Sequence, residues 1–197
     1  MNTKPRAFTI TAVVTFLFLA AAGSLFPGLY GKKTTKEKFP ATNPMLEIKV
    51  LENWKVWTEG TTFWIETKGG APARISVKPD ETAKKASDAL NKAVQRVEKI
   101  GAVKWTQSPM VETDLVTVAG AKSLKREGER TQGEEIYKIL IIVYKLDRGK
   151  MFVADGEMQE IGDKWQETWD ELDDIIRYIE PLKQDGSRYE TGQDPGD

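Results

Sequence analysis

The sequence predicts an α+β fold: a mostly antiparallel sheet of about six or seven strands with a helix on each face, preceded by an N-terminal hydrophobic helix. Three observations lead to this class. Short runs of alternating apolar and polar residues recur along the chain, and two longer segments carry apolar residues at helical spacing. One strand is apolar on both of its sides, so each face of the sheet needs a cover.

The chain begins with an export or membrane segment. Lys4 and Arg6 precede an uncharged, largely apolar run over residues 7–31, which closes on Lys32 and Lys33. Small residues near position 23 are typical of a cleavable signal peptide, whereas the length of the run also suits a retained membrane anchor. Both alternatives for residues 1–31 stay open, and both place the rest of the chain in the cell envelope, outside the cytoplasmic membrane.

The remainder divides into three parts. Residues 32–44 are basic, rich in threonine and proline, and without periodicity, which predicts a linker. Residues 45–182 carry the strand and helix patterns and predict a single domain. Residues 183–197 contain glycine, aspartate and proline with almost nothing apolar, which predicts a disordered tail.

The first half of the domain reads as four strands and a helix. Alternating runs lie at 46–50, 53–59, 61–67 and 73–78, in that order. Pro79 and Asp80 then mark the start of a helix over 80–100, whose apolar stripe ends at Gly101, a natural stop.

The second half reads as five more strands and a closing helix. Strands are expected at 103–107, 113–120, 121–127, 136–146 and 150–159. In the strand 136–146 apolar residues occupy both alternating sets, so both of its faces must be covered. The helix 163–182 places Trp165, Trp169 and Leu172 on one core-facing stripe, and its carboxylates are expected to form a solvated face.

Three of the six tryptophans fall within eleven positions, in "LENWKVWTEGTTFWIET". A two-residue turn at Gly60 and Thr61 pairs Trp57 with Trp64 on one face, among polar neighbours. Trp54 lies on the opposite face, which is the core face. The pair serves either as packing under a helix edge or loop, or as an exposed stacking platform for a ligand or partner.

A second candidate surface is the charged segment 125–135, "KREGERTQGEE". Its alternating charges and two glycines predict an exposed hairpin loop, and such loops often carry recognition. The residues expected on this surface are Lys125, Arg126, Glu127 and Arg130.

Composition excludes most reactive chemistry. The chain has no cysteine and no histidine, which removes disulfides, thiolate metal sites, cysteine nucleophiles and serine–histidine arrangements. No motif predicts a cofactor, a metal or a catalytic residue, and a net charge of −1 gives no reason to expect nucleic acid as a partner.

The order of elements resembles the PsbP and DcrB-like group of small α/β/α domains over roughly residues 45–182. The resemblance is carried by "LENW", "ARISVK", "VTVAGAKSLKRE", "YKILIIVYKLDRGKMFVADGEM" and "WDELDDIIRYIEPL". In place of the Pro-x-Gly-Trp opening common in that group, this chain has Glu52, Asn53 and Trp54. The resemblance implies an exported or lumenal protein that binds partners or assists assembly without catalysis.

The sequence therefore favours a non-enzymatic envelope module that binds a protein or envelope component. Two alternatives remain: a structural subunit of a membrane complex, and an envelope hydrolase that works with carboxylates alone.

Overall fold

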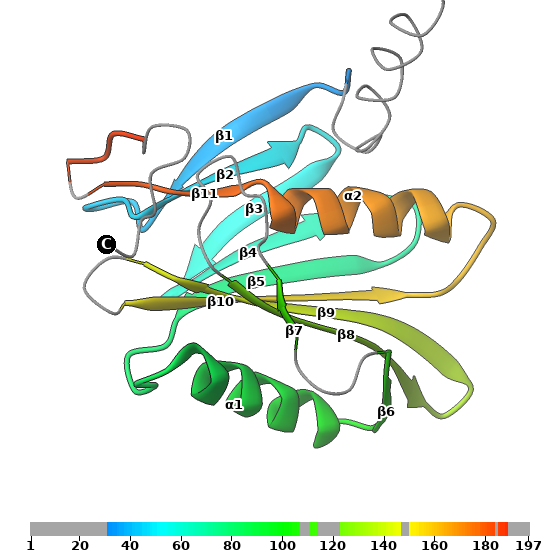
Figure 1. Ribbon diagram of the computed structural model, residues 1–197. Coiled ribbons are helices and arrows are strands. Elements are labelled where there is room, and N and C mark those ends of the chain that lie inside the picture. The colour runs from blue at the N-terminus through cyan, green and yellow to red at the C-terminus, as the bar shows by residue number, and fades with distance from the viewer. Residues whose placement is uncertain (1–30, 107–110, 114–122, 147–149, 184, 189–197) are drawn as a thin grey trace, which may run out of the picture.

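The computed structural model describes residues 31–106, 111–113, 123–146, 150–183 and 185–188, and in this part of the chain it confirms the predicted α+β class (Figure 1). The elements are β1 (Thr34–Phe39), β2 (Leu46–Leu51), β3 (Trp54–Glu59), β4 (Thr62–Thr67), β5 (Ala73–Pro79), α1 (Ala86–Glu98), β6 (Ala102–Trp105), β7 (Val111–Thr113), β8 (Ser123–Gln132), β9 (Glu135–Lys145), β10 (Met151–Gln159), α2 (Trp165–Arg177) and β11 (Ile179–Pro181).

The strands form two sheets, and every pairing between strands is antiparallel. The large sheet runs in the order β3-β4-β5-β10-β9-β8-β6, and the short β7 pairs with β8. The small sheet has the order β1-β2-β11. Local hairpins build most of the large sheet, and the pairing of β5 with β10 joins its two halves.

A helix covers each face of the large sheet, as predicted (Figure 1). On one side α2 packs over β5 and β10, with the small sheet beside it, and on the other α1 packs over β8, β9 and β10. Both faces of β9 are buried: Leu140 and Tyr144 face α2, and Ile139 and Ile141 face α1. Burial raises the pKa of the Tyr144 phenol, whose hydroxyl donates a hydrogen bond to the carbonyl of Ile176.

The first helix begins later than predicted. Residues 80–85, which were expected to be helical, lie outside the helix, and α1 starts at Ala86. The Asp80 carboxylate accepts hydrogen bonds from the backbone N–H groups of Thr82 and Ala83, each at 2.9 Å. These bonds hold a local turn, because an aspartate can offer the backbone an alternative to helical pairing.

The predicted solvated acidic face of the last helix is only partly correct. Glu171 and Asp174 are buried, whereas Asp170 is exposed. Glu171 is satisfied from three sides: Trp54 Nε1 donates to it at 2.9 Å, Asn53 Nδ2 at 3.4 Å, and Lys32 Nζ lies 2.7 Å away. A buried carboxylate needs such partners, and the helical sequence pattern alone does not reveal them.

The expectation of a linker over 32–44 is wrong, since β1 lies within that range and pairs with β2. Phe39 ends β1 and is buried, with its ring centroid 5.6 Å from that of Phe63 and 6.0 Å from that of Phe152. Because β1 is an edge strand with lysine and threonine along its exposed side, its composition looks like that of a linker.

The N-terminal hydrophobic segment and the C-terminal tail lie largely outside the described residues. The hydrophobic segment 7–31 lies outside the described residues apart from Gly31, and neither helix within the described ranges has the length and apolar character of a membrane span. In the expected tail, Arg188 forms a bridge with Leu182, and its guanidinium pairs with Glu47 and with Glu180, the latter at 3.2 Å. The prediction of a disordered tail is therefore wrong for residues 185–188, while residues 189–197 lie outside the described part.

Candidate functional site

The tryptophan hairpin has the predicted register. Trp57 pairs directly with Trp64 across a turn at Gly60 and Thr61, where Gly60 adopts a φ of 58°, a value that favours glycine. The two indole rings stack with their centroids 6.0 Å apart and their planes 15° from parallel. The pair lies on the α1 side of the sheet, but α1 packs over β8, β9 and β10 and does not extend over β3 and β4.

The two rings are not buried under the helix, and neither ring face is fully free for a ligand. Trp57 is 37% exposed, and Trp64 is half-buried. Lys55 Nζ lies 5.4 Å from the centroid of the Trp57 ring, and Arg74 Cζ lies 5.0 Å from that of Trp64. Each ring is therefore engaged by the other ring and by a cation, an arrangement that is favourable at a surface.

The segment 125–135 is not a loop, so the prediction of an exposed hairpin loop is wrong. Strand β8 continues to Gln132 and β9 begins at Glu135, with a tight turn between them in which Gly133 has a φ of 64°. Gly128, a turn signal in the sequence, lies within strand β8. The position requires glycine because a Cβ there would lie 2.8 Å from Lys104 O and from a ring atom of Trp105. Close approach of two strands explains this glycine.

The four charged residues predicted on that segment divide between the two faces of β8. Lys125 and Glu127 point to the α2 side, where Lys125 Nζ lies 2.9 Å from Glu127 and 3.7 Å from Asp173. Arg126 and Arg130 point to the α1 side. The structure therefore does not unite the six predicted surface residues.

On the α1 side, the two arginines of β8 have different surroundings. Arg126 lies over the Trp105 ring at 5.2 Å, whereas Arg130 reaches a groove that Trp64 also lines. We call this the α1 groove. It has a volume of about 460 Å³ and lies between α1 and the half of the sheet face that α1 leaves open.

Four elements supply the charged side chains of the α1 groove. Its cations are Arg74 and Lys78 from β5, Arg96 from α1 and Arg130 from β8, and its carboxylates are Asp155 and Glu157 from β10. These charged residues come to one face because Ser76 pairs with Asp155 and Arg74 with Glu157.

Each carboxylate of the groove holds two cations. Arg74 Nη2 donates to Glu157 at 2.9 Å, and Arg130 Nη2 donates to the other oxygen of Glu157 at 3.2 Å. Arg96 Nη2 donates to Asp155 Oδ2 at 2.7 Å, and Lys78 Nζ lies 3.4 Å from the same oxygen. The network links β5, β8, β10 and α1.

Several buried polar atoms of the groove have no hydrogen-bond partner among the described residues. They are Trp64 Nε1, Arg130 Nε, Arg130 Nη1 and Asp155 Oδ1. Folded proteins satisfy the great majority of such atoms, so a concentration of them in one groove indicates a place where another molecule or water completes the bonding.

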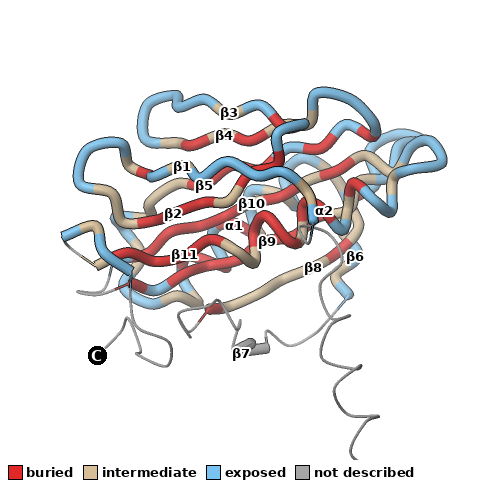
Figure 2. Tube along the Cα trace, turned by 90° about the horizontal axis from the view of Figure 1, so that it is seen from above, coloured by how far each residue is buried: buried red, intermediate tan, exposed pale blue. Residues whose placement is uncertain are grey.

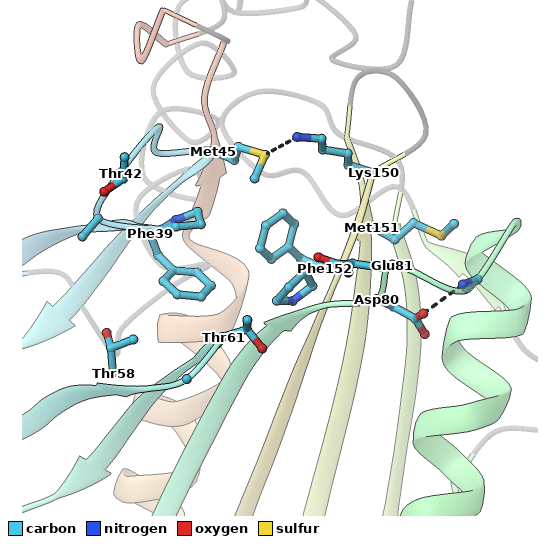
Figure 3. Close-up of a pocket in the computed structure, with 15 residues that line it drawn as sticks. Phe39, Thr42, Met45, Thr58, Thr61, Asp80, Glu81, Lys150, Met151 and Phe152 are labelled. Atoms are coloured by element: carbon cyan, nitrogen blue, oxygen red, sulfur yellow. Dashed lines mark hydrogen bonds between the residues drawn. The ribbon is translucent and has the colours of Figure 1, made fainter.

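A larger hollow, the end pocket, lies at one end of the domain and has a volume of about 680 Å³ (Figure 3). Its apolar lining includes Phe39, Phe152 and Met151. Its partly buried carboxylate, Asp80, already has partners, because it accepts hydrogen bonds from the backbone N–H groups of Thr82 and Ala83 and from the Thr82 hydroxyl. Burial would raise the pKa of Asp80, but these bonds and the charge of Lys92 lower it. We therefore identify the smaller α1 groove as the candidate site.

Sequence reasoning found Trp64 and Arg130 but missed the other charged residues of the groove. A signal was present, because Asp155 and Glu157 alternate on one side of β10, and Arg74 and Lys78 alternate on one side of β5. What the sequence lacked was the pairing of these two strands. The described ranges contain no group of three or more metal-ligating His, Cys, Asp or Glu side chains.

Comparison with known proteins identifies the fold but not a family. No family model matches the chain, and no curated protein matches its sequence. Among solved structures, LpqN, described as involved in cell envelope biogenesis of Mycobacterium tuberculosis, is similar with a TM-score of 0.50 and 12% identity over 75% of this chain and 89% of that chain. At this identity the similarity shows the fold alone.

Two further structures are similar at lower scores. A protein of unknown function from Pseudomonas aeruginosa, described as a putative regulator, gives a TM-score of 0.40 with 9% identity over 64% of this chain and 82% of that chain. A protein from Bacteroides thetaiotaomicron gives 0.42 with 11% identity over 77% of this chain and 49% of that chain.

Proposed function

We propose that this chain is a non-catalytic module of the cell envelope that binds a protein or envelope component through the open half of its α1 side. The proposal rests mainly on the α1 groove, where buried donors without partners among the described residues lie beside the stacked pair of Trp57, which is exposed, and Trp64, which is half-buried. Exposed aromatic residues next to arginine are typical of the centres of binding surfaces.

Two features support the envelope location. The uncharged run over 7–31 with basic residues at both ends is typical of export or anchoring. The fold is similar to that of LpqN, whose description places it in envelope biogenesis.

The absence of catalysis is the second part of the proposal. The chain has no histidine and no cysteine, so carboxylates would have to act alone in a hydrolase. In the α1 groove Asp155 and Glu157 each hold two cations. Both carboxylates of the groove are therefore engaged in ion pairs within the domain.

Site-directed photo-crosslinking in the native host tests the binding face. A benzoylphenylalanine at position 57 replaces an exposed aromatic residue, and the matched control position is Glu167, exposed on α2 at the opposite side. We expect one specific crosslinked species from position 57 that is absent from position 167. Equal labelling at both positions, or none at position 57, would contradict the proposal.

The double variant Trp57→Ala, Trp64→Ala sharpens the same test. We expect it to remain folded and to lose co-purification of the species crosslinked at position 57. If the double variant instead mainly lowers the melting temperature, the pair serves packing and the binding surface lies elsewhere.

Fractionation tests the location. We expect the protein from its native host in the membrane or exported fraction, with an intact mass that is either full-length or begins near position 23. A full-length mass in the cytoplasmic fraction would contradict the envelope assignment.

A further inference from the structure

We propose that the α1 groove is a binding site for an oxyanion, a carboxylate or phosphate group of a small molecule or partner, and that Arg130 is its main ligand-binding residue. This inference rests on the proposed function and names the chemical group that the binding face recognises. Three properties of the groove support it: its net charge, the burial of Arg130, and the excess of donors over acceptors among its unpaired described atoms.

The α1 groove carries an excess of positive charge. The side chains that line the groove carry four cations and two carboxylates, an excess of two positive charges, in a chain whose net charge is −1. The excess is concentrated where α1 and the sheet limit the access of water, and such a setting strengthens the attraction of an anion. A carboxylate or a phosphate monoester would compensate it.

Arg130 is a buried cation, since its side chain is only 3% exposed. Its guanidinium lies over the ring of Tyr137, with 4.7 Å between Cζ and the ring centroid. Its ion-pair partner Glu157 also pairs with Arg74. A buried guanidinium that shares one carboxylate with a second cation lacks a full counter-ion, and burying such a charge is costly.

Hydrogen-bond donors outnumber acceptors among the buried groove atoms that have no partner within the described residues. Of the orphaned atoms in the groove, three are donors, Trp64 Nε1 together with Arg130 Nε and Nη1, and one is an acceptor, Asp155 Oδ1. A ligand that completes this set must supply mainly acceptors, as an oxyanion does. Arginine presents its nitrogens as a planar fork that fits both oxygens of a carboxylate or phosphate.

The structure also indicates how binding proceeds. The two orphaned nitrogens of Arg130 are closed to solvent. An anion in the groove therefore engages them when the guanidinium turns toward it and away from Glu157, which keeps its bond to Arg74. Side-chain rearrangements of this size are common on binding. Glu157 acts in this view as an internal stand-in for the ligand.

The test uses the full chain in detergent, with inorganic phosphate and citrate as separate probes and glucose as a neutral control. Binding is followed by calorimetry and by the NMR signal of Arg130 Nε–H. We expect saturable binding of at least one anion, a shift of the Arg130 signal, and weaker binding as sodium chloride is added. The stronger probe identifies the source as phosphate or carboxylate.

Matched variants locate the site. Arg130→Met keeps an unbranched side chain but removes the charge and the donors, and Arg126→Met is the control on the same strand and face but outside the groove. We expect Arg130→Met to weaken binding about tenfold or more, the loss typical of a hydrogen bond to a charged group, and Arg126→Met to bind as the native chain does. Arg96→Met is a second groove variant, also expected to weaken binding.

The outcomes separate this inference from the proposed function. No saturable binding of either anion by the native chain, or equal loss in Arg126→Met and Arg130→Met, would overturn the oxyanion site. If position 57 nevertheless crosslinks a specific partner, the proposed function stands and recognition runs through the tryptophans alone. Anion binding that depends on Arg130 supports the site whether or not a partner is captured.

Discussion

The two sides of the large sheet differ in how completely they are closed. On the α2 side, the helix and the small sheet cover a continuous apolar layer that includes Ile65, Leu140 and Phe152. On the α1 side, the helix covers a smaller cluster around Ile141, and the sheet beyond it carries charged side chains and the tryptophan pair. Figure 2 shows the central strands of the domain as buried and much of β3, at the edge of the large sheet, as exposed.

Two tryptophans of the β3–β4 hairpin illustrate this difference. Trp54 faces the α2 side and is buried, and its indole N–H donates to Glu171 at 2.9 Å. Trp64 faces the α1 side, and its indole N–H has no partner within the described residues. Within the described residues, the buried side-chain nitrogens and oxygens that lack a partner all lie on the α1 side. The closed side therefore supplies stability, whereas the open side is suited to recognition.

The largest expected effect lies in the closed core. Leu172→Ala removes a fully buried side chain of α2 and is expected to lower the free energy of unfolding by about 2–5 kcal/mol, because the neighbours cannot fill the space completely. Urea denaturation measures the change. A loss below about 1 kcal/mol, smaller than the usual range for such a truncation, would show that the α2 side is less tightly packed than described.

The same substitution on the two sides gives the sharpest contrast. Trp54→Phe removes the bond to the buried Glu171 and is expected to cost about 2 kcal/mol, as hydrogen bonds to charged groups do. Trp64→Phe removes a donor that bonds to no described residue, so it should cost less than about 1 kcal/mol. Equal costs in thermal or urea unfolding would contradict the distinction between the sides.

Acid is expected to lower the free energy of unfolding through Glu47, which lies in β2 of the small sheet. Burial alone would raise the pKa of Glu47, but the hydrogen bond and charge of Arg188, with Lys36, outweigh it and lower the pKa below the ordinary value of 4.5. A lowered folded-state pKa contributes stability above the unfolded value, and this stability is lost as the pH falls through the folded value.

The unfolding free energy of the native chain should therefore decrease more below pH 4.5 than that of Glu47→Gln, by about 1 kcal/mol or less because Arg188 is half exposed. Arg188→Gln is the matched variant on the other side of the pair. If Glu47→Gln has the same acid dependence as the native chain, the ion pair does not form in solution.

The smallest expected effect on stability is that of Arg130→Met. Glu157 keeps Arg74 as its partner, and an apolar side chain of similar length replaces a charge that is costly to bury. The free energy of unfolding should change by less than about 1 kcal/mol in either direction. A loss above about 2 kcal/mol, approaching that of a broken buried ion pair, would assign Arg130 to the support of the fold and would weaken its role in binding.

Sequence periodicity predicted the elements with strong local patterns. The pairing of Trp57 with Trp64 and the double burial of β9 follow from alternation, which is a local property of the chain. Strand β1 was missed because an edge strand with lysine and threonine has the composition of a linker. The continuation of β8 through Gly128 was missed because the glycine reflects a close approach to Trp105, which no local pattern records.

The candidate site was predicted only in part, for a physical reason. Trp64 and Arg130 were selected as surface residues, yet they reach one groove only through β5 and β10, which pair across about 80 residues of intervening chain. Lys125 and Glu127 were grouped with Arg130 by sequence proximity, but neighbours in a strand point to opposite faces. A recognition surface built from several strands depends on long-range pairing, and the local patterns of a single sequence do not show which distant strands pair.

The exchange of the indole N–H protons of Trp54 and Trp64 with solvent, measured by NMR on one sample without ligand, tests the contrast between the two sides most directly. The bond from Trp54 to Glu171 on the closed side should hold its proton until a large part of the domain opens, whereas Trp64 needs only a local opening of the α1 groove. We expect the indole proton of Trp64 to exchange at least about tenfold faster than that of Trp54. Equal rates, or slower exchange at Trp64, would contradict it.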